Sequence, residues 1–222
     1  KMEANGFKTV IKDHPVAIGA TDFSDFIDKC KASGIQLIVC SFLLDETTNF
    51  IKQMGAKGMN KSIAITGAMA KILKDEFSTE IGAENAAYVT SISPQSGPVD
   101  MAGNGAAVAF AEKYKTKYNM SAYWISYSSY DALRVFKAAV EKAKSFKADK
   151  IIAAIEADDF EFQGLMNFKW KKENHDLVVG EVNNKLYAVL PVFQFFPDGS
   201  RHCVYPLKFK QKDFLMPGAT PQ

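Results

Sequence analysis

The sequence contains little of what marks several large classes of protein. Only 3 of its 222 residues are cysteines, and they show neither a C-x-x-C pair nor the spacing of a zinc site. A disulfide framework and a metal centre are therefore not expected. No apolar run approaches the roughly 20 residues that a membrane-spanning helix needs. The net charge of +2 gives no basic footprint, so no nucleic-acid partner is expected.

What remains is the composition of a folded protein with a large core. Hydrophobic residues make up 47% of the chain and charged residues 23%, and the mean hydropathy is −0.11. These values exclude a disordered tail, a collagen and a coiled coil. The 17 phenylalanines, set against 8 prolines, predict a phenylalanine-rich core. Cys30 and Cys40 are expected to lie in it as free thiols.

The first half of the chain has a regular rhythm of strands and helices. Runs rich in β-branched residues recur with centres about 26 residues apart, an interval that suits one βα unit. The predicted strands are Thr9–Ile11, Ile35–Cys40, Ser62–Thr66 and Ala87–Ile92, and the predicted helices surround Phe23–Cys30, Phe50–Met54 and Met69–Phe77. Thr21 or Asp22 is expected to cap the first helix. This alternation predicts a doubly wound parallel α/β sheet.

The second half has a different pattern. Ser93–Gly105 is rich in proline, glycine and serine and is predicted to be a crossing segment. Three helices are predicted after it, over Ala106–Tyr118, Ser129–Lys144 and Lys150–Ala157, without parallel strands between them. Leu186–Phe196 and Arg201–Tyr205 alternate around Asp198-Gly199 and predict a β-hairpin. The pattern indicates a second lobe, in which these helices cover a sheet whose strands do not lie between them in the sequence.

No group of residues in the sequence assembles a catalytic centre. Gly103–Val108 resembles the start of a dinucleotide fingerprint, but it lacks the third glycine and follows a loop. The scattered histidines and one acidic cluster are expected to be solvated or structural; these residues are His14, His175, His202, Asp158, Asp159 and Glu161. The expectation is a protein that is not an enzyme and carries no cofactor. The alternative to a protein without catalysis is an enzyme of flavodoxin-like architecture.

Two predicted strand ends are the candidate binding positions. In open parallel sheets, ligands bind beyond the carboxyl ends of the strands. The residues at these ends are Cys40, Ser41, Phe42 and Leu43 after one strand, and Thr66, Gly67, Ala68 and Met69 after the next. The small Ser41 and Gly67 would let a ligand approach the backbone. Phe42 and Met69 either form an apolar wall for the ligand or belong to the core.

The order of these segments resembles a known family. Gly19–Ser24 leads into a helix, and Ile35–Cys40 and Ile51–Gly58 follow at familiar spacing. Ala111–Tyr114 and Ser126–Ala132 look like two helices of the family's first lobe, while Phe193-Gln194, Asp198-Gly199 and Val204–Pro206 are similar to its closing hairpin. The chain resembles the C-terminal two-thirds of type I periplasmic solute-binding proteins, the branched-chain amino-acid-binding family of ABC transporters.

This resemblance implies a two-lobed clamshell that captures a small solute and delivers it to an ABC permease in the membrane. Residues 1–92 and 190–222 would form lobe two, and residues 93–189 would form an incomplete lobe one. The implied location is periplasmic or extracellular, with a lipid anchor as one option. Among ligand-binding proteins without catalysis, the alternative is a ligand-sensing regulator or receptor domain of the same fold.

The predicted ligand is a small neutral solute, apolar or aromatic, which can carry a carboxylate but no free ammonium. Amino-acid binders of the family place an acidic residue at these strand ends, whereas here neither strand end carries an Asp or Glu, and the first acidic residue after Cys40 is Asp45. An unpaired, desolvated ammonium costs several kcal/mol. Trp124 and Tyr127, just before the predicted helix at Ser129, are expected to contribute from the other lobe.

The chain is expected to need a companion. Lys1–Asn5 followed by Gly6 reads as the end of a helix whose body is missing. The predicted helices Ala106–Tyr118 and Ser129–Lys144 carry apolar faces for which the chain supplies no sheet, and soluble monomers rarely expose such patches. The expected partner is a missing N-terminal half or a second copy of the chain.

Overall fold

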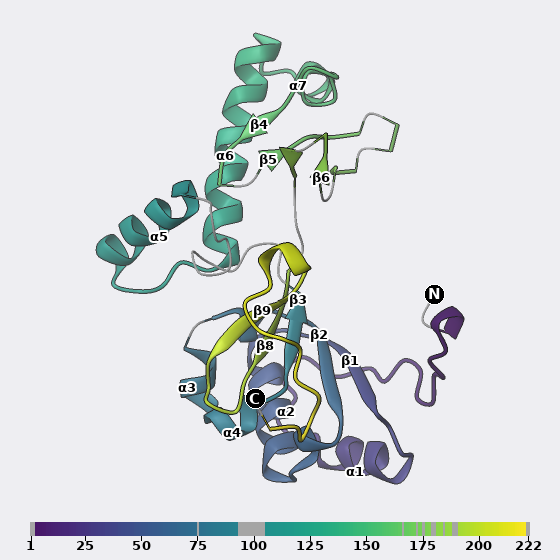
Figure 1. Ribbon diagram of the computed structural model, residues 1–222. Helices are drawn as coiled ribbons and strands as arrows, with labels where there is room; N and C mark the ends of the chain where they lie inside the picture. The colour runs from purple at the N-terminus through teal and green to yellow at the C-terminus, as the bar shows by residue number, and fades with distance from the viewer. Residues whose placement is uncertain are drawn as a thin grey trace. The chain divides into compact units, whose positions relative to one another are not determined.

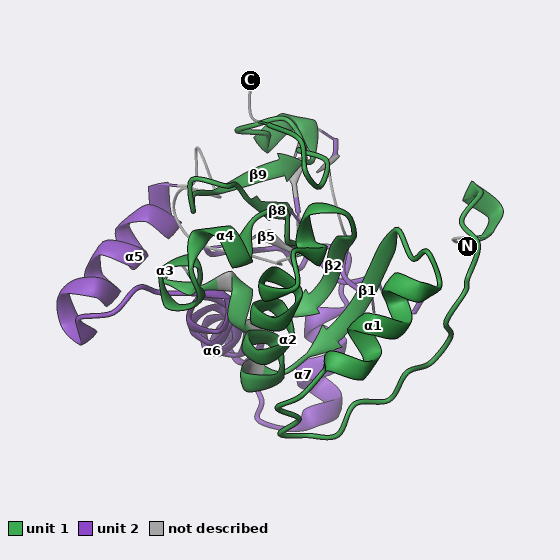
Figure 2. Cartoon of the chain, turned by 90° about the horizontal axis from the view of Figure 1, so that it is seen from below, with its two compact units in different colours: residues 1–92, 192–222 green, residues 93–191 purple. Residues whose placement is uncertain are grey.

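The computed structural model divides the chain into two units (Figure 2), formed by residues 1–92 with 192–222 and by residues 93–191. It describes residues 3–74, 76–92, 105–165, 167–171, 173–174, 176–178, 181–183, 185–187 and 191–220. We call the first unit, to which the chain returns at its end, unit 1 and the other unit 2. The predicted crossing segment from Ser93 lies outside the described residues up to position 104, as does His175.

The described residues of unit 1 form a parallel strand pair, a small antiparallel sheet, four α-helices and short 3-10 turns, whose arrangement is drawn in Figure 1. In chain order its elements are η1 (Glu3–Asn5), α1 (Ser24–Ala32), β1 (Leu37–Phe42), α2 (Leu44–Ala56), η2 (Met59–Lys61), β2 (Ala64–Met69), η3 (Ala70–Leu73), α3 (Phe77–Ile81), α4 (Ala83–Ala86), β3 (Thr90–Ile92), β8 (Val192–Phe195), β9 (Arg201–Tyr205) and η4 (Leu207–Phe209). The helices and the parallel pair confirm the predicted α/β class.

The parallel pair consists of β1 and β2, and the antiparallel sheet has the order β3-β8-β9. Two hydroxyl groups join these sheets. Thr90 Oγ1 donates to the Ile65 carbonyl at 3.0 Å, and Ser91 Oγ donates to the Gly67 carbonyl at 3.0 Å. Side-chain donors of β3 therefore satisfy the carbonyls of β2 that face away from β1.

A cluster of phenylalanine rings forms part of the core of unit 1, as the composition predicts. Phe50 on α2 is fully buried, and its ring lies 5.5 Å from that of Phe23 and 5.3 Å from that of Phe42. The apolar stripe of α1 buries Ile27 and Cys30. The predicted cap at Thr21 or Asp22 is wrong, since Phe23 is the N-cap of α1 and its side chain makes no capping bond. Asp22 instead accepts a hydrogen bond from the Ser24 N–H, just ahead of the helix. That bond lowers the pKa of the Asp22 carboxyl.

Two further predictions for unit 1 are also wrong. Thr9–Ile11 is not a strand, and Val10 is 52% exposed. A strand needs a neighbour for its ladder, and none of the described strands pairs with this run. The single helix predicted over Met69–Phe77 is instead the end of β2, the 3-10 turn η3 and the start of the short helix α3. Gly82, at φ +91°, separates α3 from α4.

Unit 2 is mainly helical. Its elements are α5 (Gly105–Tyr118), α6 (Trp124–Ala143), α7 (Ala148–Ile155), β4 (Phe162–Gln163), β5 (Asn167–Phe168), β6 (Glu181–Val182) and β7 (Lys185–Leu186). The three predicted helices are confirmed, but α6 begins five residues before the predicted start. A reciprocal cap between Tyr123 and Ser126 explains the early start, because it satisfies donors of the first turn.

The apolar faces of α5 and α6 differ in how far they are covered. On α5, Ala111 is buried, and the Phe110 ring lies 5.0 Å from that of Tyr127 on α6. The expectation that α5 leaves its face open is therefore wrong, because α6 covers it. On α6, by contrast, Leu133 is 73% exposed and Phe136 is 50% exposed.

The end of the chain forms the predicted hairpin. Strands β8 and β9 pair antiparallel around the turn at Asp198-Gly199. Gln194 fixes the segment that follows, since its side chain bonds both the carbonyl and the N–H of Leu215 at 2.8 Å. None of the helices in the described part of the chain is long and apolar enough to cross a membrane.

Candidate functional site

The structure brings the two predicted strand ends side by side. In the parallel register, Cys40 lies opposite Gly67, Ser41 opposite Ala68 and Phe42 opposite Met69. The remaining residue, Thr66, lies opposite Val39. Both strands thus end at the same edge of the pair, where α2 begins directly after β1. This edge is the carboxyl-end position at which open α/β sheets bind ligands.

The residues at this edge differ in what they expose. Ser41 and Ala68 are exposed neighbours, whereas Cys40, Phe42 and Thr66 are half-buried. Met69 is 1% exposed, so its side chain belongs to the core and offers no apolar wall. Phe42 is anchored from below by Phe50 and Phe23, with ring separations of 5.3 and 5.7 Å. The accessible surface therefore consists of Ser41, Ala68 and the outer parts of Phe42 and Thr66.

Gly67 has a structural reason to be glycine. Its φ is +147°, and a Cβ built on it would lie 1.7 Å from the carbonyl oxygen of Cys40. The backbone of β1, and not a ligand, therefore occupies the space that a side chain would need. The sequence suggests that Gly67 lets a ligand approach the backbone. The structure gives this glycine another role, which is to let β1 and β2 come close together.

Cys40 is a structural thiol. Its Sγ donates to the Thr66 carbonyl at 3.5 Å and lies 3.4 Å from the sulfur of Met69. Burial raises the pKa of the Cys40 thiol to about 12, so the thiolate is scarce at neutral pH. Cys40 is therefore not a nucleophile, which agrees with a site without covalent chemistry.

The carboxylates nearest to the edge lie in the first turn of α2. Asp45 is exposed, whereas Glu46 is buried and accepts a hydrogen bond from the Gly19 N–H. That bond lowers the pKa of the Glu46 carboxyl. Glu46 thus ties the segment before α1 to α2, and Asp45 is the carboxylate of this turn that faces solvent.

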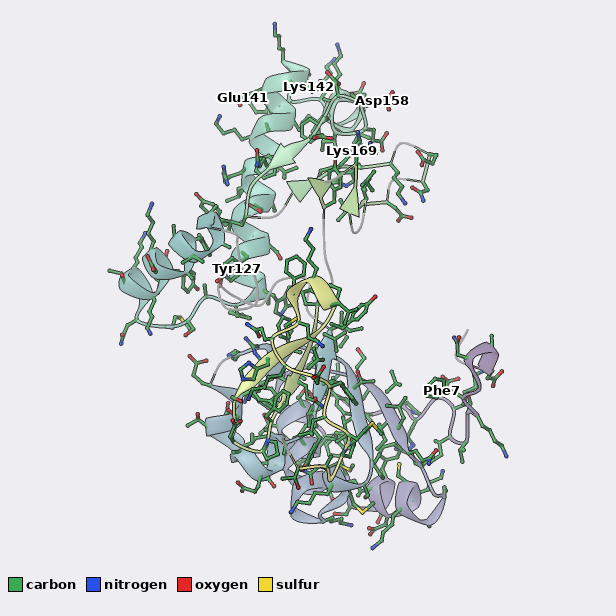
Figure 3. All side chains as sticks on the ribbon, viewed as in Figure 1. Phe7, Tyr127, Glu141, Lys142, Asp158 and Lys169 are labelled. Carbon is green, nitrogen blue, oxygen red and sulfur yellow. The ribbon has the colours of Figure 1, made fainter. Side chains whose placement is uncertain are left out.

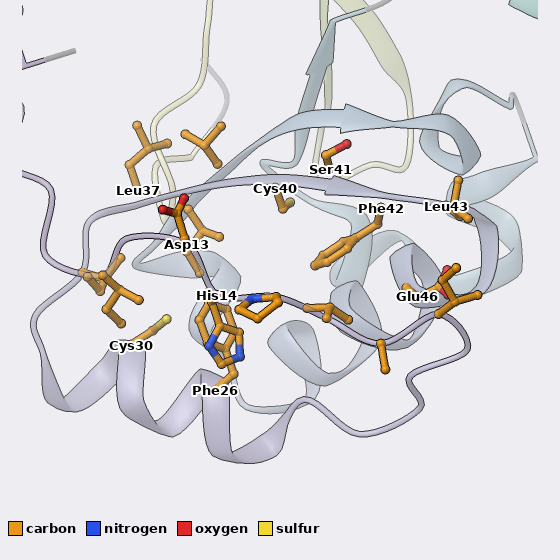
Figure 4. Close-up of a pocket in the computed structure, with 18 residues that line it drawn as sticks. Asp13, His14, Phe26, Cys30, Leu37, Cys40, Ser41, Phe42, Leu43 and Glu46 are labelled. Atoms are coloured by element: carbon orange, nitrogen blue, oxygen red, sulfur yellow. The ribbon is translucent and has the colours of Figure 1, made fainter. Parts of the chain in front are cut away.

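A groove of about 510 Å³ runs beside β1 (Figure 4). One wall is β1 with Leu43, another is α1 with Phe26 and Cys30, and the segment 13–18 closes the third side. His14 belongs to that segment, and its ring stacks on Phe26 with centroids 4.2 Å apart. The sequence interpretation missed this groove because Pro15 and the turn at Gly19 make the segment look like a plain loop.

Trp124 and Tyr127 lie in the first two turns of α6, in unit 2, and not before a helix as predicted. Tyr127, labelled in Figure 3, is fully buried and packs on Phe110. The indole Nε1 of Trp124 is buried and has no hydrogen-bond acceptor among the described residues. These two residues belong to the core and rim of unit 2, whereas the strand-end residues belong to unit 1.

Nothing in the described ranges forms a metal site, since no three His, Cys, Asp or Glu residues gather there. The described histidines also fit structural roles. His14 stacks on Phe26, and His202 packs edge-on against Phe196. Burial is the main cause that lowers the pKa of His202.

Comparison with known proteins identifies the family. The chain matches the periplasmic binding protein family over residues 1–186, and it belongs to that family. Members of this family are ligand-binding transport components and not enzymes, and the sequence predicts the same class for this chain. No curated protein sequence gives a significant match.

Three solved structures show the same fold. A solute-binding protein of an ABC transporter from R. palustris, in complex with benzoate, is 16% identical with a TM-score of 0.68, covering 98% of this chain and 55% of that one. An amino acid ABC transporter substrate-binding protein from Pseudomonas fluorescens is 11% identical with a TM-score of 0.64, covering 93% and 53%. A leucine-binding protein from Thermotoga maritima is 22% identical with a TM-score of 0.63, covering 83% and 48%.

These likenesses establish the type I periplasmic binding protein fold, as the sequence predicted. The chain spans about half the length of these solved proteins, since it covers 55%, 53% and 48% of them. An incomplete lobe is consistent with that coverage.

Proposed function

We propose that this chain is part of the solute-binding component of an ABC importer, which captures a small solute between two lobes. The family match over residues 1–186 is the observation that supports this proposal most strongly. In the proposal, residues 1–92 and 190–222 form lobe two, and residues 93–189 form an incomplete lobe one. The division into units at residues 92 and 192 supports these boundaries.

The proposed ligand surface in unit 1 lies at the ends of β1 and β2. Ser41 and Ala68 supply an exposed, sterically open pair, and Ser41 adds a hydroxyl group. Phe42 supplies apolar area from a ring that Phe50 holds in place. Thr66 adds the outer part of its side chain. Cys40, Gly67 and Met69 support this surface from beneath, through the close strand pairing and the sulfur contact at 3.4 Å.

Lobe one would contribute Trp124 and Tyr127. The Nε1–H of Trp124 is a buried donor without an acceptor among the described residues. A ligand carboxylate is an acceptor that would satisfy it, because a buried donor without a partner costs free energy. Tyr127 would support Trp124 from within the helix, one turn further along α6.

The proposed ligand is an apolar or aromatic solute with a carboxylate and without an ammonium group. Of the first-turn carboxylates of α2, Glu46 already binds the Gly19 N–H, and Asp45 faces solvent. A desolvated ammonium without an anionic partner costs several kcal/mol, whereas burying an aromatic ring contributes about 1.5–3 kcal/mol. The benzoate complex of the R. palustris relative is an example of such a ligand on this fold.

The proposed partners follow from the same assignment. An ABC permease in the membrane would receive the solute, and the protein would work in the periplasm or outside the cell, with a lipid anchor as one form of attachment. A missing N-terminal half, or a second copy, would complete lobe one. The open face of α6 around Leu133 and Phe136 supports the need for such a companion.

Isothermal titration of the complete protein tests the ligand class. We expect saturable binding of benzoate, no binding of leucine, and no chemical conversion of the bound acid. Ala68→Phe places a ring on the exposed strand end and should weaken benzoate binding at least tenfold. Ala32→Phe, at the exposed end of α1, is the matched control and should bind as the wild type does. Tight binding of leucine without benzoate binding would refute the ligand class.

A further inference from the structure

The outer edge of β1 carries backbone groups that face no strand in the described part of the chain. The carbonyl of Gln36 accepts from the Ala64 N–H at 2.9 Å, so Gln36 faces β2. Residues along a parallel strand alternate between its two neighbours. The amides of Ile38 and Cys40 therefore face β2, and those of Leu37, Val39 and Ser41 face away. Among the described strands, β1 pairs with β2 alone.

The sequence of β1 is that of an interior strand. Its six residues, LIVCSF, contain no charge, proline or glycine. Such near-continuous apolar runs are typical of parallel strands that have neighbours on both sides. Natural edge strands are instead protected by lysine, proline or a bulge, because an open edge invites pairing. The protein protects the far edge of β2 with the Thr90 and Ser91 hydroxyls, yet gives β1 no such protection.

The space beside this edge suits one more strand. The groove of about 510 Å³ follows β1 from Leu37 to Leu43, and Phe26 and Cys30 of α1 form its second wall. Apolar side chains on its walls remain in water, since Val39 is 59%, Leu43 is 60% and Ile18 is 88% exposed. Neighbouring strands lie about 4.8 Å apart, so a strand in this position would cover these side chains and bond the free amides.

We infer that this groove receives a β-strand from a part of the same protein that lies outside these 222 residues. The strand runs parallel to β1 and has apolar side chains toward Phe26 and Cys30. The solved relatives are about twice as long as this chain, so a protein of their size has ample further residues to supply it. The inference concerns the assembly of unit 1 and does not depend on which solute the protein binds.

Hydrogen–deuterium exchange, read at single-residue resolution, tests the inference by comparing the 222-residue chain with the complete product of its gene. We expect exchange of the Leu37, Val39 and Ser41 amides to slow at least tenfold in the complete protein. The Ile38 and Cys40 amides, which face β2, serve as internal controls and should exchange slowly in both. Val39→Pro should lower the melting temperature of the complete protein and leave that of the 222-residue chain unchanged, because only the former would lose a ladder bond.

Three results would overturn the inference. The first is equal exchange of these three amides in the two proteins, and the second is a gene that encodes no residues beyond these 222. The third is protection in the 222-residue chain that grows with protein concentration, because a second copy would then occupy the edge. Loss of benzoate binding alone would affect the proposed function and leave this inference intact.

Discussion

The two units bury their apolar side chains to different extents. In unit 1, helices and strands enclose the phenylalanine cluster, so that Phe50, Phe77, Phe193 and Phe195 are all nearly inaccessible. In unit 2, the helices pack mainly on one another, and Leu133, Phe136, Phe146 and Ile152 remain at least half exposed. Helices that pack on a sheet bury their apolar faces against it. Helices that pack mainly on one another, as in unit 2, leave part of their apolar surface exposed.

The sequence supplies a separate reporter for each unit. All three cysteines, at positions 30, 40 and 203, belong to unit 1, and both tryptophans, at positions 124 and 170, belong to unit 2. Thiol labelling during denaturation therefore follows unit 1, and tryptophan fluorescence follows unit 2. Substitutions in one unit can be tested for effects on the other.

The largest expected effect is that of Phe50→Ala. Removing this fully buried ring, which contacts the rings of Phe23 and Phe42, should cost unit 1 about 3–5 kcal/mol of unfolding free energy. Thiol labelling should begin at a lower urea concentration, while the fluorescence transition should stay in place. Phe146→Ala, at an 84% exposed site in unit 2, is the control and should change stability by less than about 0.5 kcal/mol. If Phe50→Ala moves both transitions equally, the two units do not unfold separately.

The next effect is that of Gly67→Ala. The added Cβ would lie 1.7 Å from the Cys40 carbonyl oxygen at a φ of +147°, so β1 and β2 must separate, at a cost of about 2–4 kcal/mol. Urea denaturation followed by thiol labelling measures this loss. Gly34→Ala has the same kind of positive φ, +64°, but open space around it, so it should cost only about 1 kcal/mol. Equal costs at the two positions would refute the close approach of the strands at Gly67.

The smallest effect concerns pH. The Cys40 thiol has a pKa of about 12 in the folded protein against an ordinary 9.0, so above pH 9 the unfolded chain loses a proton that the folded protein keeps. The stability of unit 1 should therefore fall as pH rises, by about 1.4 kcal/mol at pH 10 from this thiol. Urea unfolding monitored by circular dichroism between pH 7 and 10 measures the fall. Cys40→Ala should have a shallower dependence, and an identical slope would contradict the burial of this thiol.

Periodic apolar spacing predicted the helices well, because α1, α2 and α5 each bury one stripe of side chains. The two strands themselves were also predictable, since β-branched residues are concentrated there, but their ends were not. β1 continues to Phe42 and β2 to Met69, beyond the predicted ends at Cys40 and Thr66, so Ser41, Gly67 and Ala68 lie within the strands. The run Thr9–Ile11 has the composition of a strand, but a strand forms only where a neighbour offers a ladder, and spacing along the chain does not reveal neighbours. The core position of Met69 and the groove beside β1 depend on tertiary packing, which local sequence patterns do not encode.

Unit 1 is assembled from both ends of the chain, and this arrangement affects the order of events during synthesis. The Gln194 side chain donates to the Tyr88 carbonyl across 106 positions, and β8 pairs with β3 across a similar interval. A ribosome must therefore translate all of unit 2 before β8 leaves the exit tunnel. Until then the nascent chain presents β3 unpaired, as a surface that a chaperone can hold, while α5 to α7 are already free to pack.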